Sequence, residues 1–451
     1  MKSQQGRETF ASRLGFVLAA SGAAVGLGNI WGFPTQVASN GGGAFLLMYI
    51  LLIAFVAFPM LVVELAIGRS GQANPVDSIK SLTENKPLKR IASIVGWAGI
   101  SVPCFVLAFY SIVGGWILCY FLSSLTDLIA WNEATMWLEG FSVSRNLFGT
   151  LLFYVLTIII VQGGVQKGIE KWSVRLMPML FILFGVLFVY VMTQTGAVTG
   201  LKHYLIPDFS KIWDKDLLLA AMGQGFFSLT IGGCSMLIYG SYLSKKESLV
   251  KMAVSVAAID TSVAFLAGLV IIPAMFVAMA QGVSIYDDAG QLLNSDTLVF
   301  QVLPLLFENL GILGKLGAVI FFLLLSIAAL TSSISMLQCP VALIEERRDT
   351  RSAWHSWIIG LVIALLSTVI IFNFGALFGF VIKLSTQYLQ PIVALCICLF
   401  GGWVWNRNKK LQELSSGDEL VLGTWFGRIW PLYVRWICPL FVTSIVWASL
   451  V

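Results

Sequence analysis

The sequence offers few polar groups for chemistry inside its apolar runs, and the most unusual of them is a lone acid. Asp260 lies in the middle of the run AVSVAAIDTSVAFLAG. An ionisable side chain at such a position is costly to bury and is a functional hypothesis by default. We interpret Asp260 as a sodium ligand or a proton carrier. The alternative is a structural carboxylate whose hydrogen bonds are satisfied within the protein.

Three consecutive hydroxyl residues, Thr331, Ser332 and Ser333, lie in a second apolar run. Hydroxyl and carbonyl oxygens are the ligands that a hard cation prefers. The alternative is that these hydroxyls bond back to their own helix. A second acid, Glu64 in VVELAIGR, is expected to satisfy free amides of a broken helix rather than to contact a substrate.

Two apolar runs are interrupted by glycines and polar residues, at 21–29 (SGAAVGLGN) and at 228–235 (SLTIGGCS). Each glycine weakens a helix by about 1 kcal/mol, so we expect an unwound segment in each run. Unwound backbone inside a bilayer is tolerated only where it lines a cavity. Its free carbonyls suit a cation, and the N–H groups of the next half-helix suit a carboxylate. The alternative is that the glycines permit tight helix packing.

The composition identifies the solvent of this chain as lipid. Of 451 residues, 11% are charged and 58% are hydrophobic, whereas soluble domains carry about 25% charged residues. This excludes a cytosolic enzyme and a nucleic-acid binder. The cysteines and histidines form no zinc-binding pattern, and no phosphate-binding glycine loop is present. We therefore expect no catalytic residues and no enzyme activity.

Apolar runs of about 20 residues can cross a bilayer as helices. We identify eleven, at 10–36, 41–68, 91–125, 147–166, 172–194, 217–243, 247–281, 314–344, 353–375, 377–405 and 429–450. Most Lys and Arg residues fall in loops that lie inside if the N-terminus is cytoplasmic. We therefore expect a cytoplasmic N-terminus and, because eleven is odd, a C-terminus outside.

The two interruptions occupy equivalent positions in two blocks of five spans. Because five is odd, the second block crosses in the opposite direction, and paired broken helices in inverted halves indicate a transporter binding site. We expect an all-α integral membrane protein of 11 transmembrane helices, with two inverted five-helix repeats, broken helices 1 and 6, and helix 11. The expected units are a first repeat (1–194), an outside loop (195–216), a second repeat (217–405) that contains an outside loop (282–313), and a cytoplasmic loop with helix 11 (406–451).

Several motifs resemble the helix 1–2 signature of the neurotransmitter:sodium symporters, bacterial amino-acid branch. They are RLG at 13–15, GLGN at 26–29, FP at 33–34 and NGGGAF at 40–45, followed by Glu64, Gly68, Arg69, Pro103, Tyr110 and the hydroxyl run at 331–333. The resemblance implies import of a hydrophobic amino acid, coupled to two sodium ions, by alternating access across the plasma (inner) membrane. Two alternatives of the same fold are a transport-inactive sensor or receptor and a proton-coupled transporter.

The resemblance also implies a set of binding residues. The first sodium site would use Ala24, Asn29, Ser228 and Asp260, and the second would use Gly22, Val25, Ala328, Thr331 and Ser332. The substrate site would use Ala24, Leu27, Gly28, Val106, Tyr110, Phe227, Thr230, Gly233, Ser333 and Met336. The inner gate would use Arg7, Phe10, Tyr242 and Glu346. Helix 5 would unwind over the segment from Gly168 to Pro178.

Two of these positions indicate which ion and which amino acid the protein binds. Asp260 stands where some relatives have Asn, so it supplies a negative charge directly and we expect that chloride is not required. Gly233 stands where a leucine-preferring relative has an aromatic residue. The missing ring leaves room, which favours a large hydrophobic or aromatic amino acid.

The outer gate departs from the family pattern. Gly32 replaces the usual Arg, and residues 373–400 contain no acid that could pair with one. Outer closure is therefore expected to rely on packing of Tyr110, Phe227 and Trp31. This loss of the ion pair is the feature that keeps the sensor alternative open.

Overall fold

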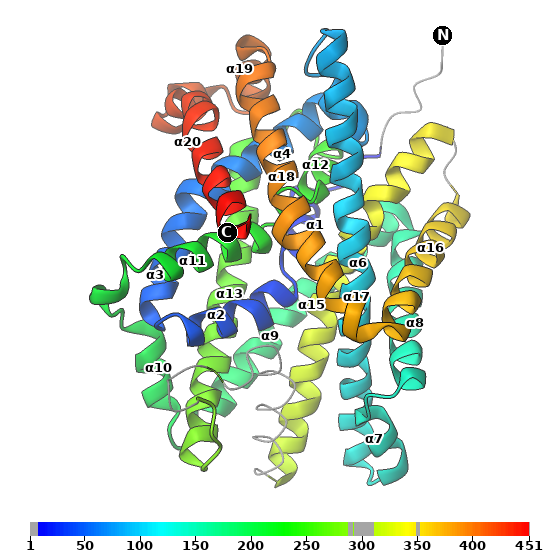
Figure 1. Ribbon diagram of the computed structural model, residues 1–451, viewed down its shortest axis with the longest axis vertical. Coiled ribbons are helices and arrows are strands. Elements are labelled where there is room, and N and C mark those ends of the chain that lie inside the picture. The colour runs from blue at the N-terminus through cyan, green and yellow to red at the C-terminus, as the bar shows by residue number, and fades with distance from the viewer. Residues whose placement is uncertain (1–7, 287–291, 293–310, 349–351, 451) are drawn as a thin grey trace.

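The computed structural model describes residues 8–286, 292, 311–348 and 352–450 (Figure 1). Arg7 and most of the predicted outside loop 282–313 lie outside these residues. The described part consists of helices joined by turns and loops. They are α1 (Arg13–Ala24), η1 (Gly28–Gly32), α2 (Phe33–Ser39), α3 (Gly43–Leu52), η2 (Ile53–Ala57), α4 (Phe58–Gly71), α5 (Pro75–Lys80), α6 (Lys86–Leu128), α7 (Asn132–Glu139), α8 (Val143–Val161), η3 (Val165–Glu170), α9 (Lys171–Met192), α10 (Ala197–Leu205), η4 (Phe209–Lys211), α11 (Lys215–Ser228), α12 (Ser235–Ser241), α13 (Leu249–Ala280), α15 (Gly311–Arg348), α16 (Ala353–Phe372), α17 (Phe374–Ile382), η6 (Lys383–Leu389), α18 (Gln390–Leu399), η7 (Phe400–Val404), α19 (Arg407–Ser415), η8 (Glu419–Gly423) and α20 (Trp425–Leu450).

The membrane-crossing helices follow the predicted spans. Among the described residues, nine helices are long and apolar enough to cross a membrane, and the pair Arg13–Ala24 and Gly28–Ser39 makes a tenth span with a bend of 57°. The remaining predicted span, 217–243, corresponds to α11 and α12, which residues 229–234 separate. Each half is too short to cross a membrane alone, so the two halves together correspond to one broken span.

The break in the first span lies where the glycines predict it. Val25 is extended, with ψ of 109°, and it ends α1. A Cβ atom on Gly26 would lie 2.4 Å from Ser332 Oγ and 2.8 Å from the Tyr110 hydroxyl. Because real Cβ atoms do not approach other atoms so closely, glycine is required for the backbone to reach these side chains. The interruption at 21–29 is therefore a real break with close neighbours.

The break in the sixth span has a different local cause. Thr230, Gly232 and Cys234 all have positive φ, at 53°, 85° and 55°. A left-handed conformation is rare for residues other than glycine and is an outlier for a β-branched residue such as Thr. Alternate left-handed residues cannot continue a right-handed helix. The chain therefore leaves α11 at Ser228 and re-enters a helix at Ser235.

The broken helices lie inside the bundle. In Figure 1, α7 lies at the bottom, α10 lies in the lower part on the left, and α19 lies at the top. Helix α1 packs against α9, α13 and α15, whereas α12 packs against α4. The long α6 lies along α8 and α15. Because packed helices surround them, the free backbone groups of both breaks face protein or cavity rather than lipid.

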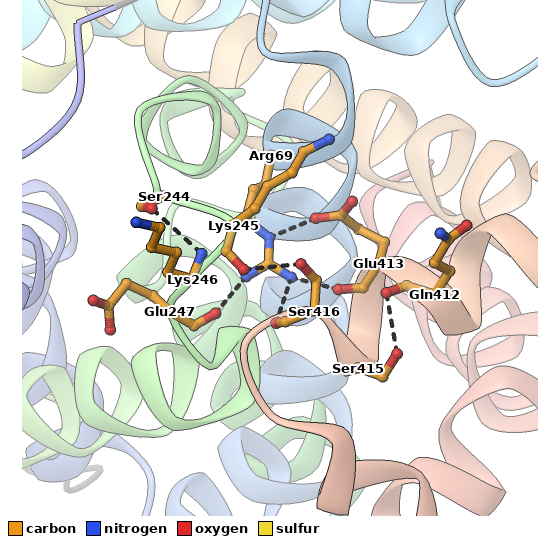
Figure 2. Close-up of polar contacts among 9 residues, drawn as sticks. All are labelled: Arg69, Ser244, Lys245, Lys246, Glu247, Gln412, Glu413, Ser415 and Ser416. Atoms are coloured by element: carbon orange, nitrogen blue, oxygen red, sulfur yellow. Dashed lines mark hydrogen bonds and ion pairs between the residues drawn. The ribbon is translucent and has the colours of Figure 1, made fainter.

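A buried arginine joins segments that are distant along the chain (Figure 2). Arg69, in the last turn of α4, is fully buried and pairs through Nε with the Glu413 carboxylate on α19. Its Nη1 donates to the Glu247 carbonyl at 2.7 Å, and its Nη2 donates to the Glu413 carbonyl. Arg13 also pairs with the Glu247 carboxylate, but its own side chain is 71% exposed. Arg69 thus holds α4, the α12–α13 loop and α19 together.

We expect Arg69→Ala to destabilise the protein strongly, by about 3–5 kcal/mol, since it leaves the Glu413 carboxylate buried without its partner. The exposed pair supplies the control, because Arg13→Ala should cost at most about 1 kcal/mol. Unfolding of the purified protein in detergent measures both. Equal stability of the two variants would contradict a structural role for the buried arginine.

Candidate functional site

The oxygens expected to form the second sodium site meet at the contact between α1 and α15. Ser332 Oγ lies 2.8 Å from the Val25 carbonyl and 3.4 Å from the Gly22 carbonyl. Thr331 Oγ1 bonds back to its own helix, at 3.1 Å from the Ile327 carbonyl and 3.0 Å from the Ala328 carbonyl. All five residues are buried. A buried group of uncharged oxygens is the environment that a hard monovalent cation prefers, so these residues fit sodium.

The residues expected to form the first sodium site make a hydrogen-bonded cluster from three helices. Asn29 Nδ2 donates to Asp260 Oδ1 at 2.7 Å and to Ser228 Oγ at 2.8 Å. Ser228 Oγ donates to Asp260 Oδ2 at 2.7 Å, and Tyr49 donates to Ser228 at 3.2 Å. Ala24 lies in the wall of the adjacent pocket. The structure therefore joins Asn29, Ser228 and Asp260 directly.

The charge of this cluster is not balanced by a basic side chain. Asp260 is fully buried, and no ion pair found between described residues includes it. A buried carboxylate without a counter-charge is strongly unfavourable. The site therefore requires either a cation or a proton at Asp260, which fits a sodium site and equally a protonation site.

A pocket of about 460 Å³ lies between the two breaks and α6. It is lined by Ala24, Gly26, Leu27, Gly28, Val102, Pro103, Val106, Tyr110, Phe227, Thr230, Gly233, Ser235, Ser332, Met336 and Gln390. Nine of the ten residues expected in the substrate site are in this wall. The exception is Ser333, whose hydroxyl lies 2.8 Å from Thr157 Oγ1 on α8. The structure does not bring Ser333 to the pocket.

Some residues that line the pocket were not expected in the substrate site from the sequence. Val102 precedes Val106 by one helical turn, as Val106 precedes Tyr110, so helical spacing along this face could have found it. Pro103 lies beside Val102 on the same helix. Gln390 has no comparable signal, because nothing in the sequence places it against helix 6.

The two ends of the pocket differ in polarity. At one end the Leu27 N–H donates to the Tyr110 hydroxyl at 3.2 Å, and a Cβ on Gly28 would lie 2.8 Å from the Phe227 ring. At the break of helix 6, the buried Thr230 Oγ1 has no hydrogen-bond partner among the described residues. The nearest atom to a Cβ on Gly233 would be the Thr230 carbonyl, at 3.1 Å. A Cβ there would be tight against this carbonyl, but apart from the adjoining chain no described residue other than Thr230 lies within 4 Å of it, and the Thr230 hydroxyl is unused.

A second cavity lies beyond Phe227, where the outer gate is expected. It has about 840 Å³ and is lined by Gln36, Ala220, Gly223, Gln224, Phe226, Phe227, Ile231, Thr386, Gln387, Gln390, Pro391 and Ile445. A Cβ on Gly32 would lie 3.4 Å from Gln224 Oε1, and Gln224 Nε2 donates to the Gly28 carbonyl at 2.7 Å. A neutral amide therefore stands beside the position from which the family's arginine is missing.

The expected inner-gate residues are only partly together. Phe10 packs edge-on against Tyr242, with ring centroids 6.3 Å apart, and Tyr242 accepts from Gln338 Nε2 at 2.8 Å. Glu346 accepts from the backbone and side-chain nitrogens of Asn74, both at 2.8 Å. Arg7, the expected partner of Glu346, lies outside the described residues.

The start of helix 5 is helical and bound to the N-terminal segment. Gly168 lies in the π-helix η3, and Pro178 lies inside α9. The carboxylate of Glu170 accepts from the Ala11 N–H at 2.8 Å and from the Ser12 hydroxyl at 2.9 Å. Nothing in the sequence marks Glu170 as a contact of the N-terminal segment, because its partners lie far away along the chain.

Comparisons with known proteins agree with this architecture. The uncharacterized sodium-dependent transporter YhdH of Bacillus subtilis is 36% identical, over 97% of this chain and 96% of its own. A second such transporter, from Haemophilus influenzae, is 34% identical over 97% of both chains. The sodium-dependent serotonin transporter of Drosophila melanogaster is 27% identical over 98% of this chain and 76% of its own.

A solved structure extends the likeness to the fold. The crystal structure of MhsT in complex with L-phenylalanine matches with a TM-score of 0.83 and 36% identity, over 98% of this chain and 100% of that one. This match confirms the predicted all-α fold of two inverted five-helix repeats with broken helices 1 and 6. The sequence profile of the sodium:neurotransmitter symporter family, whose members are transporters and not enzymes, matches residues 7–146 and 139–451. This chain therefore belongs to the sodium:neurotransmitter symporter family.

Proposed function

We propose that this chain is a symporter that imports a large hydrophobic or aromatic amino acid together with sodium, by alternating access. The observation that carries the proposal is the buried Asp260 carboxylate, which has no basic partner among the described residues and is bonded to Asn29 and Ser228. These residues adjoin the pocket between the two breaks. A cation bound there would balance the charge and complete the site for the amino acid.

The substrate proposal rests on the polarity of the pocket. The N–H groups of Leu27 and Gly28, at the start of the second half of helix 1, suit a carboxylate, with the Tyr110 hydroxyl beside them. Carbonyls near Ala24, Phe227 and Thr230 suit the amino group. The side chain would face Val106, Phe227, Gly233 and Met336. The phenylalanine complex of MhsT supports a large apolar side chain.

The ion proposal is two sodium ions and no chloride. One ion would be held at Ala24, Asn29, Ser228 and Asp260, and the other at Gly22, Val25, Ala328, Thr331 and Ser332. Asp260 supplies the negative charge for the first ion, so an added anion has no role there. The distribution of Lys and Arg supports an inner-membrane protein with a cytoplasmic N-terminus and a C-terminus outside.

A scan of the twenty amino acids, with the purified protein in sodium and in potassium, tests the function. A ligand that binds the folded state at 100 times its Kd adds about 2.7 kcal/mol of stability. We expect tryptophan, phenylalanine, tyrosine and leucine to raise Tm in sodium and to have little effect in potassium. Stabilisation by leucine but not by tryptophan or tyrosine would refute the substrate proposal. Equal stabilisation in both salts, rising at acidic pH, would favour proton coupling.

Two adjacent hydroxyls test the second sodium site. We expect Ser332→Ala to raise the sodium concentration for half-maximal binding about tenfold, which corresponds to about 1.4 kcal/mol. Ser333→Ala is the matched control, because that hydroxyl contacts Thr157 instead, and its sodium dependence should change by less than about twofold. Sodium titrations of amino-acid binding measure both. An equal effect of the two substitutions would argue against this assignment.

Uptake into proteoliposomes tests chloride independence. We expect sodium-driven uptake to be unchanged when chloride is replaced by gluconate, since Asp260 carries the charge. The substitution Asp260→Asn keeps the shape of the side chain but removes the charge, and should lower sodium affinity at least tenfold. Loss of wild-type uptake in gluconate would refute the proposal.

A further inference from the structure

One peptide group in the break of helix 6 is held at both edges by side chains of other helices. Its N–H, from Gly232, donates to Glu64 Oε1 at 2.6 Å. Its carbonyl, from Ile231, accepts from Gln390 Nε2 at 3.0 Å. Glu64 belongs to α4, Gln390 begins α18, and both side chains are buried. A peptide between two half-helices has lost its helical partners, so these side chains satisfy what would be a costly pair of free groups.

The backbone of the break also lies directly on α18. Gly232 has φ of +85°, and a Cβ there would lie 2.2 Å from the Gln390 carbonyl oxygen and 3.0 Å from Ala394 Cβ. Only glycine allows this approach together with this conformation. The side chain of Gln390 therefore bonds to the Ile231 carbonyl, and its backbone carbonyl lies against Gly232, the next residue.

This peptide group separates two cavities. Its neighbours Thr230 and Gly233 line the substrate pocket, whereas Ile231 lines the larger cavity beyond Phe227. Gln390 lines both cavities. If the peptide rotates or moves away from α18, the wall between the two cavities is lost at this point.

We propose that Gln390 is a positioning residue of the substrate pocket. By donating to the Ile231 carbonyl, it fixes the orientation of the Ile231–Gly232 peptide, and through that peptide it places Thr230 and Gly233 in the pocket wall. A side chain at this position must donate a hydrogen bond and carry no negative charge, because the oxygen that faces it is an acceptor. This inference rests on the proposed function, since it concerns the pocket for the amino acid.

Substitutions that remove or restore the donor test the proposal. We expect Gln390→Leu to weaken sodium-dependent tryptophan binding at least tenfold and to speed tryptophan dissociation, because the Ile231 carbonyl loses its donor. In Gln390→Glu, the protonated carboxyl can donate to that carbonyl, whereas the carboxylate repels it. At pH 5.5, binding to the glutamate variant should therefore lie within about threefold of wild type at the same pH, and it should weaken as pH rises.

The wild-type pH profile corrects for Glu64, on the other edge of the peptide, and for Asp260, since every variant contains both. Gln387→Leu and Gln387→Glu are the matched controls, because Gln387 is exposed in the larger cavity and does not line the pocket. Both control variants should bind tryptophan as wild type does, at pH 5.5 and at higher pH. If the leucine variant does not fold, the proposal is tested with the glutamate variant alone. Its tryptophan binding is then compared at pH 5.5 and at higher pH in one preparation. Binding to Gln390→Glu at pH 5.5 that is weakened tenfold or more would overturn the proposal.

Hydrogen–deuterium exchange separates failure of this proposal from failure of the proposed function. Amides of residues 229–235 should exchange at least tenfold faster in Gln390→Leu than in Gln387→Leu, with no amino acid present. If wild type binds no amino acid in sodium, the proposed function fails while this measurement still tests the contact. Unchanged exchange in Gln390→Leu would overturn the positioning role.

Discussion

The structure depends on one constraint, which is that a peptide group freed from a helix inside a membrane must find its partner within the protein. Two breaks free several such groups, and side chains from other helices satisfy them. In helix 1, the Ser332 hydroxyl donates to the Val25 carbonyl, and the Tyr110 hydroxyl accepts from the Leu27 N–H. In helix 6, Glu64 accepts from the Gly232 N–H and Gln390 donates to the Ile231 carbonyl, so both polar groups of one peptide are satisfied. The binding site is thus built from the same contacts that make the breaks tolerable.

A second consequence concerns charge. The described residues place an acid at the centre of the bundle and provide it with amide and hydroxyl donors but no base. Hydrogen bonds stabilise the carboxylate without neutralising it, so its charge is left for a bound cation or a proton to balance. A basic partner would have balanced it permanently. No such partner is present among the described residues, and Gln224, beside Gly32, is neutral. This central region therefore needs a bound cation or a proton to balance Asp260.

The sequence predicted the elements well because glycine clusters and hydrophobic runs are local signals. The breaks at 21–29 and 228–235, and the contact of Glu64 with a free amide, were predicted correctly. Ser333 was expected in the substrate site, but Ser332 lines the pocket and Ser333 contacts Thr157 instead. Consecutive residues on a helix face different directions, and the orientation of α15, which the sequence does not give, sets which one faces the pocket. Glu170 and Gln390 could not be found, since each meets its partner only through packing of helices distant in sequence.

Arg69 and Glu413 are separated by 344 residues along the chain. At about 5–20 residues per second, a ribosome needs on the order of 20–70 s to cover that distance. During this time the guanidinium of Arg69 lacks the Glu413 carboxylate, its partner in the folded protein. The buried pair of Arg69 and Glu413 can therefore form only after nearly the whole chain has been made, so complete burial of this arginine is a late step of folding.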